Sequence, residues 1–254
     1  MDISIEQANG ICTIRFNRPE KKNAITSAMY QSMGDGIKAA EADPAVRVIV
    51  LAGHPNIFTA GNDLEDFMKQ PPSTGASPVF QFMAALKDAG KPVVAAVAGA
   101  AVGVGTTMLL HCDLVYAADN ARFSMPFSQL GLCPEFSSSL LLPRLVGYQR
   151  AAEKLMLGEA FLADEAQAMG LVNRVLPADQ FDAFVLAQAA KLAALPASSV
   201  RITKQLMKRG VASDIDQQMA AEGEHFRRML SAPEAKEAFT AFFEKRKPDF
   251  SRFS

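Results

Sequence analysis

The sequence lacks tryptophan altogether and holds only three histidines and three cysteines among 254 residues. His54, His111 and His225 show no metal-ligand spacing, and neither a G-x-S-x-G nor a G-x-G-x-x-G motif is present. Cysteines this few and odd in number are typical of reduced thiols, not of a disulfide framework. We therefore expect a cytoplasmic protein with no metal site and no redox cofactor.

An excess of charge of either sign is also missing, because 26 basic residues stand against 27 acidic ones. Phosphate binding needs a clustered positive field, so nucleic acid is not an expected partner. The first ten residues, MDISIEQANG, contain no basic region followed by an apolar stretch, and the ending RFS is not a Ser-Lys-Leu signal. We expect neither a secretory leader nor a peroxisomal address.

Only one apolar run is long enough to cross a membrane, residues 93–110, VVAAVAGAAVGVGTTMLL. Gly99, Gly103 and Gly105 interrupt it, and most of its other residues are Ala or Val. This composition favours a buried strand, a tight glycine turn and a buried helix over a membrane span. We therefore expect no membrane association.

Strand-like and helix-like segments alternate through the first part of the chain. Asn9-Gly10 between two short apolar runs predicts a β-hairpin, and Thr26 or Ser27 can cap a helix that reaches about Ala42. The apolar runs at residues 46–53, 93–97 and 113–118 predict buried strands. Residues 54–63 are expected to form a loop, and residues 71–78, PPSTGASP, a flexible segment. Alternation of this kind predicts an α/β layered core.

After residue 195 the pattern is helical only, with three helices predicted over residues 198–209, 215–230 and 233–245. We divide the chain into a core of residues 1–195 and a helical C-terminal region of residues 196–254. This region carries more large apolar side chains than a free appendage should expose, which favours a role in oligomer formation. They are Leu206, Met207, Phe226, Met229, Phe239, Phe242 and Phe243.

Three segments together resemble the enoyl-CoA hydratase/isomerase family, which has the crotonase fold. They are FTAGNDLEDF (residues 58–67), VAGAAVGVGTTMLLHCDLVYAADNARFSMPFSQLG (residues 97–131) and CPEFSSSLLLPRLVG (residues 133–147). Within the family, the pairing of AGNDL with FSQLGLCPEFSSS is most similar to the peroxisomal-type enoyl-CoA delta isomerases. The resemblance implies a spiral of ββα turns and a C-terminal helical trimerisation region. It also implies a homotrimer or a hexamer.

The resemblance implies an oxyanion hole made of two backbone N–H groups, which stabilise the enolate of a thioester without reorganising. The matching residues are Asn62, which follows Ala60 and Gly61, and Val104, which follows Gly103. Small residues at these positions let the backbone approach the thioester. The alternative is that Gly103-Val104-Gly105 is merely a strand-to-helix turn, since lone glycine motifs are common.

Hydratases of the family position water with two glutamates, and the matching positions here are Thr107 and Phe127. Neither residue can act as a general base, and Phe127 would make the site drier. Glu135 instead matches the single catalytic glutamate of the delta isomerases. One carboxylate is enough for an isomerase, because it removes a proton from one carbon and returns it to another.

A structural explanation of Glu135 remains open. Pro134-Glu135 fits the first turn of a helix, where proline is favoured and an acid complements the dipole. Asp63 is expected to cap a helix that begins near Leu64. His111, at the end of an apolar helix, is expected to be a buried histidine with a hydrogen-bond partner.

For coenzyme A, the resemblance implies that residues 21–24, including Lys22 and Ala24, flank the binding groove together with residues 58–61. It places Lys245 near the CoA phosphates, often across a subunit boundary. The alternative for the EKRK sequence around Lys245 is a solvated helix end, where cations suit the helix dipole.

These observations lead to three hypotheses. The first is isomerisation of 3-enoyl-CoA to 2-trans-enoyl-CoA in fatty acid β-oxidation, with coenzyme A as part of the substrate and no separate cofactor. The second is an enoyl-CoA hydratase or another acyl-CoA enzyme of the same fold. The third is a non-catalytic protein that binds acyl-CoA.

Overall fold

The structure, a computed structural model, describes residues 1–69 and 76–253. Two β-sheets form its centre, one six-stranded in the order β1-β2-β3-β5-β7-β10 and one four-stranded in the order β4-β6-β8-β9. The strands of the larger sheet are β1 (Ile3–Ala8), β2 (Ile11–Phe16), β3 (Val48–Ala52), β5 (Val93–Val97), β7 (Leu114–Ala118) and β10 (Arg174–Leu176). Those of the smaller sheet are β4 (Ile57–Thr59), β6 (Ala100–Val102), β8 (Arg122–Ser124) and β9 (Phe161–Leu162).

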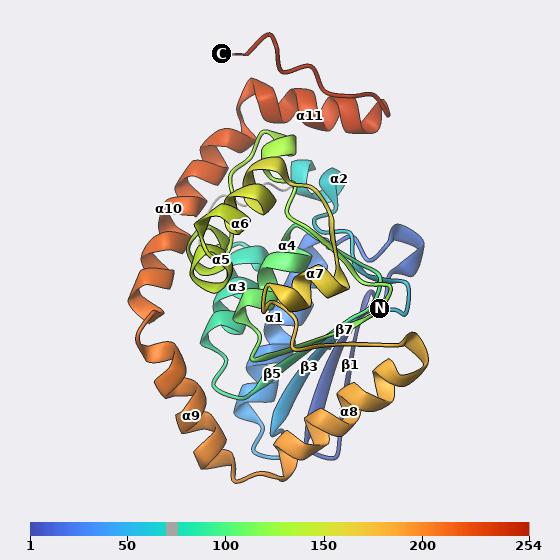
Figure 1. The fold of residues 1–254 in the computed structure, drawn as a ribbon, viewed down its shortest axis with the longest axis vertical. Helices are drawn as coiled ribbons and strands as arrows, with labels where there is room; N and C mark the ends of the chain where they lie inside the picture. Colours follow the sequence, from blue (N-terminus) through green and yellow to red (C-terminus); the bar gives the residue numbers. More distant parts are fainter. Residues whose placement is uncertain (70–75, 254) are drawn as a thin grey trace.

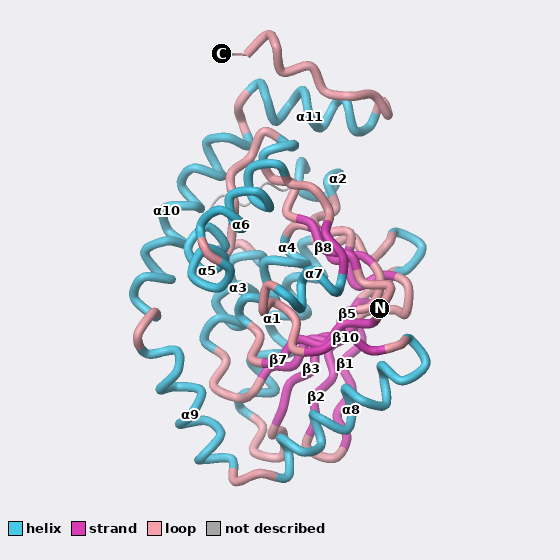
Figure 2. Tube along the Cα trace, in the orientation of Figure 1, coloured by secondary structure: helices cyan, strands magenta, loops and turns pink. Residues whose placement is uncertain are grey.

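Helices surround the two sheets (Figure 1). They are α1 (Ser27–Ala42), α2 (Leu64–Lys69), α3 (Pro78–Asp88), α4 (Val104–Thr107), α5 (Ser138–Val146), α6 (Tyr148–Ala152), α7 (Ala163–Ala168), α8 (Ala178–Ala194), α9 (Ala197–Arg209), α10 (Ala212–Leu230) and α11 (Pro233–Phe243). The six-stranded sheet separates two cores. The larger core lies between this sheet, the smaller sheet and α1 and α3, and the smaller core lies between the sheet and α8 (Figure 2).

Successive strands alternate between the sheets, since β3, β5 and β7 belong to the larger sheet and β4, β6 and β8 to the smaller one. Each turn of the chain thus adds one strand to each sheet and then a helix. This repeated ββα turn, with parallel pairing of β3, β5 and β7, is the predicted spiral, and the α/β fold class is confirmed.

Local sequence signals act as predicted at the start of the chain. Asn9 and Gly10 both have positive φ, 52° and 76°, and connect β1 to the antiparallel β2. The Thr26 side chain accepts a hydrogen bond from the Met29 N–H and caps α1. The hairpin and the first helix are therefore confirmed.

The prediction for residues 93–110 is confirmed in part, because this segment lies inside the protein and forms a buried strand, a glycine turn and a helix, but it also contains the second strand β6 before the glycine turn. The prediction of a loop over residues 54–63 is wrong in part, since it contains β4. β4, β6 and β9 have at most three residues each, too few for a period-two pattern to emerge from the sequence. In residues 1–69 and 76–253, no single helix is long and apolar enough to span a membrane; the pair α8 and α9, bent by 104°, passes that test of length and composition together.

The three C-terminal helices are confirmed as α9, α10 and α11, and α10 packs along α5 (Figure 1). Phe226 and Phe239 are buried in the chain itself, while Leu206, Met207 and Phe242 are exposed. The division at residue 195 stays a prediction. Of the predicted flexible segment 71–78, residues 71–75 lie outside the described residues.

Candidate active site

A cavity of about 500 Å³ lies where β4 and β6 end, and all but one of the predicted site residues line it. They are Lys22, Ala24, Ala60, Gly61, Asn62, Gly103, Val104, Phe127 and Glu135. β4 and β6 pair in parallel with Thr59 opposite Ala101. Asn62 and Val104 each come three residues after this pair, so both lie at the carboxyl ends of neighbouring strands.

The N–H of Asn62 is left available by the way its loop pairs with the chain before α1. Ile25 donates to the Gly61 carbonyl at 2.8 Å, and the Asp63 N–H donates to the Ile25 carbonyl at 2.9 Å. This parallel bridge uses the groups on either side of Asn62 and not its own N–H. Among the hydrogen bonds recorded for residues 1–69 and 76–253, none has the Asn62 amide as donor.

The second amide, that of Val104, is the first N–H of α4 and has no acceptor within that helix. Gly103 precedes it with φ 56° and ψ −118°, a conformation that only glycine adopts without strain. Gly61 approaches the same strand closely, because a Cβ there would lie 2.9 Å from the Val102 carbonyl oxygen. The glycines therefore set the spacing of the two amide donors.

Asn23 fixes the loop that borders the cavity on the Lys22 side. It is fully buried with φ 53°, and its Nδ2 donates to the carbonyls of Ile57 and Phe58 at 3.1 and 3.0 Å. The Thr59 hydroxyl donates to the Asn23 carbonyl and accepts from the Gly61 N–H. This network ties the predicted CoA loop to the strand that leads to Asn62.

Asp63 has the structural role that was predicted for it. Its Oδ1 accepts from the Asp66 N–H at 3.2 Å and caps α2, while its Oδ2 binds Arg18 at 2.7 Å. The Arg18 guanidinium and the capping bonds lower the pKa of Asp63, although burial opposes them. Asp63 is therefore a poor candidate for a general base.

Glu135 lies in the loop before α5 and not in its first turn, so the alternative interpretation, in which it belongs to the start of a helix, is wrong. α5 begins at Ser138, and both Phe136 and Ser137 have left-handed backbones, with φ of 58° and 55°. Two consecutive left-handed residues prevent α5 from extending towards the N-terminus as far as Glu135. The Glu135 side chain is 8% exposed, and its Oε1 has no hydrogen-bond partner among the described residues.

Burial raises the pKa of Glu135 to about 8, and the negative charge of Glu222 adds to the effect. Tyr30 lies close by, and burial and the Glu135 charge raise its pKa well above the usual value. The Tyr30 hydroxyl donates to Asn62 Oδ1 at 2.5 Å and so orients the residue that carries the first amide donor. Sequence reasoning missed Tyr30 and Glu222, because helical spacing shows only that a side chain faces inward.

Glu135 also lines a second, largely apolar cavity of about 350 Å³. Phe67 and Phe226 border both cavities and contact each other edge to face, with ring centroids 6.2 Å apart. The walls of the second cavity include Val79, Phe80, Met83, Phe136 and Met219. The carboxylate thus stands at the junction of a partly polar and an apolar compartment.

The positions that match the two hydratase glutamates contribute no acid. Thr107 is fully buried and does not line either cavity, and Phe127, 5% exposed, lines the larger one. His111 is the buried, hydrogen-bonded histidine that was predicted. Its Nε2 lies 2.8 Å from the Phe136 carbonyl oxygen, and burial lowers its pKa to about 3, so it is neutral.

Lys245 is the predicted site residue that does not line the cavity. It follows α11 with φ 54°, and its side chain is exposed. Its neighbours Phe242 and Phe243 do line the cavity. The expected contact of Lys245 with CoA across a subunit boundary stays a prediction.

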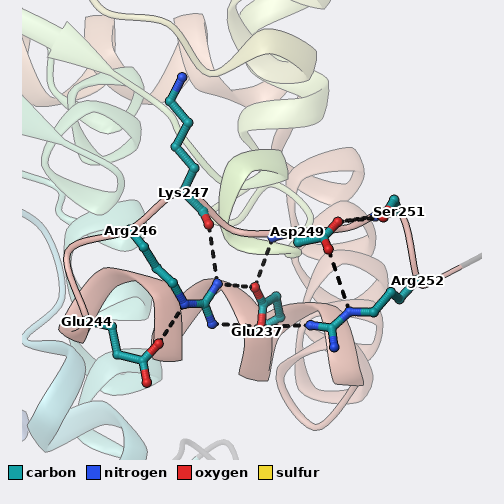
Figure 3. Close-up of polar contacts among 7 residues, drawn as sticks. All are labelled: Glu237, Glu244, Arg246, Lys247, Asp249, Ser251 and Arg252. Carbon is teal, nitrogen blue, oxygen red and sulfur yellow. Dashed lines mark hydrogen bonds and ion pairs between the residues drawn. The ribbon is translucent and has the colours of Figure 1, made fainter.

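The chain after α11 folds back along that helix through an ionic network centred on Glu237 (Figure 3). Arg246 binds both carboxylate oxygens of Glu237, at 2.5 and 3.1 Å, and the Asp249 N–H donates to the same group at 2.9 Å. Arg252 approaches Glu237 to 3.7 Å. These contacts anchor the helix that supplies Phe242 and Phe243 to the cavity wall.

Comparisons with known proteins identify the family of the chain. The family model described as enoyl-CoA hydratase/isomerase matches residues 6–252. Enoyl-CoA delta isomerase 2 of Rattus norvegicus is 40% identical over 213 residues, which are 82% of this chain but only 54% of that protein. The chain thus spans about half the length of this curated relative.

A crotonyl-CoA hydratase of Syntrophomonas wolfei is 33% identical over 98% of this chain and 97% of its own. Among solved structures, that of Pseudomonas aeruginosa OdaA superposes with a TM-score of 0.93 at 47% identity, covering 95% of this chain and 98% of that one. Fold, family model and relatives therefore agree. The chain belongs to the enoyl-CoA hydratase/isomerase family.

Proposed function

We propose that this protein converts 3-enoyl-CoA into 2-trans-enoyl-CoA, with Glu135 as the only proton carrier. One observation carries the proposal. Of the three carboxylates that line the larger cavity, Asp63 is ion-paired, Glu65 is exposed, and Glu135 is buried with Oε1 free of partners among the described residues. A buried carboxylate with a raised pKa is suited to accept a proton and return it.

In the proposed reaction the thioester oxygen accepts hydrogen bonds from the N–H groups of Asn62 and Val104. The Glu135 carboxylate removes a proton from C2, and the electron pair spreads over a dienolate whose negative oxygen the two amides stabilise. Protonated Glu135 then delivers its proton to C4. C2 loses one hydrogen and C4 gains one, so the double bond moves from C3–C4 to C2–C3 with no net change in composition.

Hydration is the second candidate, because relatives named as hydratases match this chain over nearly their whole length. Against it, the two positions that would hold and activate water carry Thr107 and Phe127. An apolar residue, Phe127, at this place in the cavity wall favours a reaction that excludes water.

The discriminating experiment offers the purified protein a 3-enoyl-CoA and a 2-trans-enoyl-CoA in separate assays. We expect the first to be converted into the second, while the second gains no water to form a 3-hydroxyacyl-CoA. Product analysis by mass separates the two reactions, because hydration adds the mass of water and isomerisation adds nothing. Hydration without isomerisation would replace the proposal by the second candidate, and neither reaction would favour a non-catalytic acyl-CoA binder.

The proposed substrate accounts for the polar side of the larger cavity. Lys21 and Lys22 border it on the loop held by Asn23, where cations can meet the phosphates of CoA. The same reaction, in fatty acid β-oxidation, requires no metal and no redox cofactor, since no electrons leave the substrate and amide donors replace a Lewis acid.

We also propose a homotrimer, or a hexamer of two trimers, held partly by the helices after residue 195. The support is the row of exposed apolar residues on α9, where Ile202, Leu206 and Met207 are 54%, 62% and 70% exposed. Sedimentation should give three or six times the monomer mass of 27.3 kDa. Replacing Leu206 and Met207 together by lysine should shift the protein towards monomers. A monomeric unmodified protein at micromolar concentration would contradict this proposal.

A further inference from the structure

We propose that Glu222 of α10 is a positioning residue for the reaction: its carboxylate holds the loop that carries Glu135, and its charge sets the pH above which Glu135 can act as the base. This inference rests on the proposed function of Glu135. Glu222 lies 87 residues away in the sequence (222 − 135), is 6% exposed and lines the apolar cavity together with Glu135.

Both oxygens of Glu222 are occupied by the start of α5. Oε2 accepts from the Ser137 N–H at 2.6 Å, and Oε1 accepts from the Ser139 N–H at 3.0 Å and from the Ser139 hydroxyl. Ser137, at the N-cap position, does not cap the helix, because its hydroxyl donates to the Ile215 carbonyl instead. Glu222 therefore supplies from another helix the cap that α5 lacks.

The loop needs such support because its backbone is strained. Phe136 and Ser137 are consecutive non-glycine residues in the left-handed region, which persists only when the surroundings enforce it. On one side, His111 bonds the Phe136 carbonyl and stacks on its ring with centroids 3.9 Å apart. On the other side, the Glu222 carboxylate accepts hydrogen bonds from the backbone N–H groups of Ser137 and Ser139. Together these contacts fix the direction in which Glu135 leaves the backbone.

The two buried carboxylates differ in the partners that stabilise a negative charge. Three donors from Ser137 and Ser139 stabilise the charge on Glu222, although burial raises its pKa. Glu135 has an oxygen without a partner among the described residues, so it is the member of the pair that ionises at the higher pH. Among the described residues, other titratable or charged groups near Glu135 are Tyr30 on α1, Cys133 on its own loop and Arg227 on the wall of the apolar cavity. The charged residues that line the larger cavity with it are Arg18, Lys21, Lys22, Asp63 and Glu65.

The test is Glu222→Gln, which preserves size and one acceptor but removes the charge. With the neighbouring charge gone, the acid limb of the pH–kcat/KM profile should move to lower pH by about one unit. The loosened loop should lower maximal kcat about 10-fold, with KM changed less than 3-fold. A matched control is Gln218→Ala, one helical turn away, which removes a hydrogen bond to the Ser139 hydroxyl but no charge. It should leave the pH profile in place.

A measurement independent of turnover separates this inference from the proposed function. In protein labelled with ¹³C at glutamate carboxylates, the signal lost in Glu135→Gln reports the protonation of Glu135. Its titration midpoint should be lower in Glu222→Gln than in the unchanged protein. An unchanged midpoint in folded Glu222→Gln would overturn the inference, whereas a protein that shows the shift but does not isomerise 3-enoyl-CoA would overturn only the proposed function.

If Glu222→Gln does not fold, Glu222→Asp tests the same contacts. It retains the charge but withdraws the carboxylate by one methylene, so it cannot reach both amides. We expect a lower kcat, with the titration midpoint of Glu135 unchanged within experimental error, as in the Gln218→Ala control. Unchanged kcat in folded Glu222→Asp would overturn the positioning role.

Discussion

Replacing Glu135 by glutamine should lower the turnover of 3-enoyl-CoA by about 10²–10⁴-fold, the usual contribution of a general base. Glutamine fills the same space but cannot accept the proton from C2, while acyl-CoA binding should change little. Steady-state kinetics and a binding titration on one preparation measure both quantities. Glu224→Gln, an exposed glutamate on α10, is the matched control and should keep full activity. Near-normal turnover in folded Glu135→Gln would refute the assignment.

The stability of this variant should also depend on pH in a definite direction. The folded-state pKa of Glu135, about 8, lies above its ordinary value of 4.5. Its contribution to folding is therefore fully present below pH 4.5 and is lost as the pH rises through 8. Glutamine does not ionise, so the stability of Glu135→Gln relative to the unchanged protein should rise with pH, by on the order of 5 kcal/mol at pH 9. Denaturant unfolding at pH 5 and pH 9 measures the difference.

Gly61→Ala should lower kcat by about 10²–10³-fold, the loss expected when one oxyanion donor is displaced. The backbone there has φ 85°, and an added Cβ would lie 2.9 Å from the Val102 carbonyl oxygen. Alanine must therefore move the backbone that carries the Asn62 N–H. Because this donor acts mainly on the developing enolate, kcat should fall more than KM rises.

The control for this substitution is Gly210→Ala at the end of α9. Gly210 has φ −71°, and no atom lies within 4 Å of a Cβ built there. Circular dichroism should show both variants folded. Full activity of folded Gly61→Ala would mean that the Asn62 amide does not bind the thioester oxygen.

Local sequence signals predicted those parts of the fold that depend on neighbouring residues. Asn9-Gly10 and the Thr26 cap act within four residues of their position, and the apolar runs of β3 and β5 are buried on both faces. The short strands β4, β6 and β9 could not be predicted in this way, because their pairing partners are distant in the chain.

In the candidate site, too, the features that depend on neighbouring residues could be predicted and those that depend on distant residues could not. The glycines that position Asn62 and Val104 lie next to them in sequence, so the motifs were visible. The environment of Glu135 was not visible, because the left-handed Phe136 and Ser137 that keep it out of α5 depend on contacts with His111 and Glu222. The helix-start interpretation failed for this reason, since Pro134-Glu135 is a sound local signal that tertiary contacts override.

The position of Glu135 at the junction of the two cavities affects which carbons of a substrate can react and which tail lengths fit. In the proposed reaction Asn62 and Val104 would hold the thioester at the carboxyl ends of β4 and β6, while Glu135 is carried on a loop that Glu222 holds. The reacting carbons would thus be selected by their position relative to the thioester and not relative to the far end of the acyl tail. Acyl tails of different length would share one reacting position, and the wall around Val79, Met83 and Met219 would set only how long a tail fits.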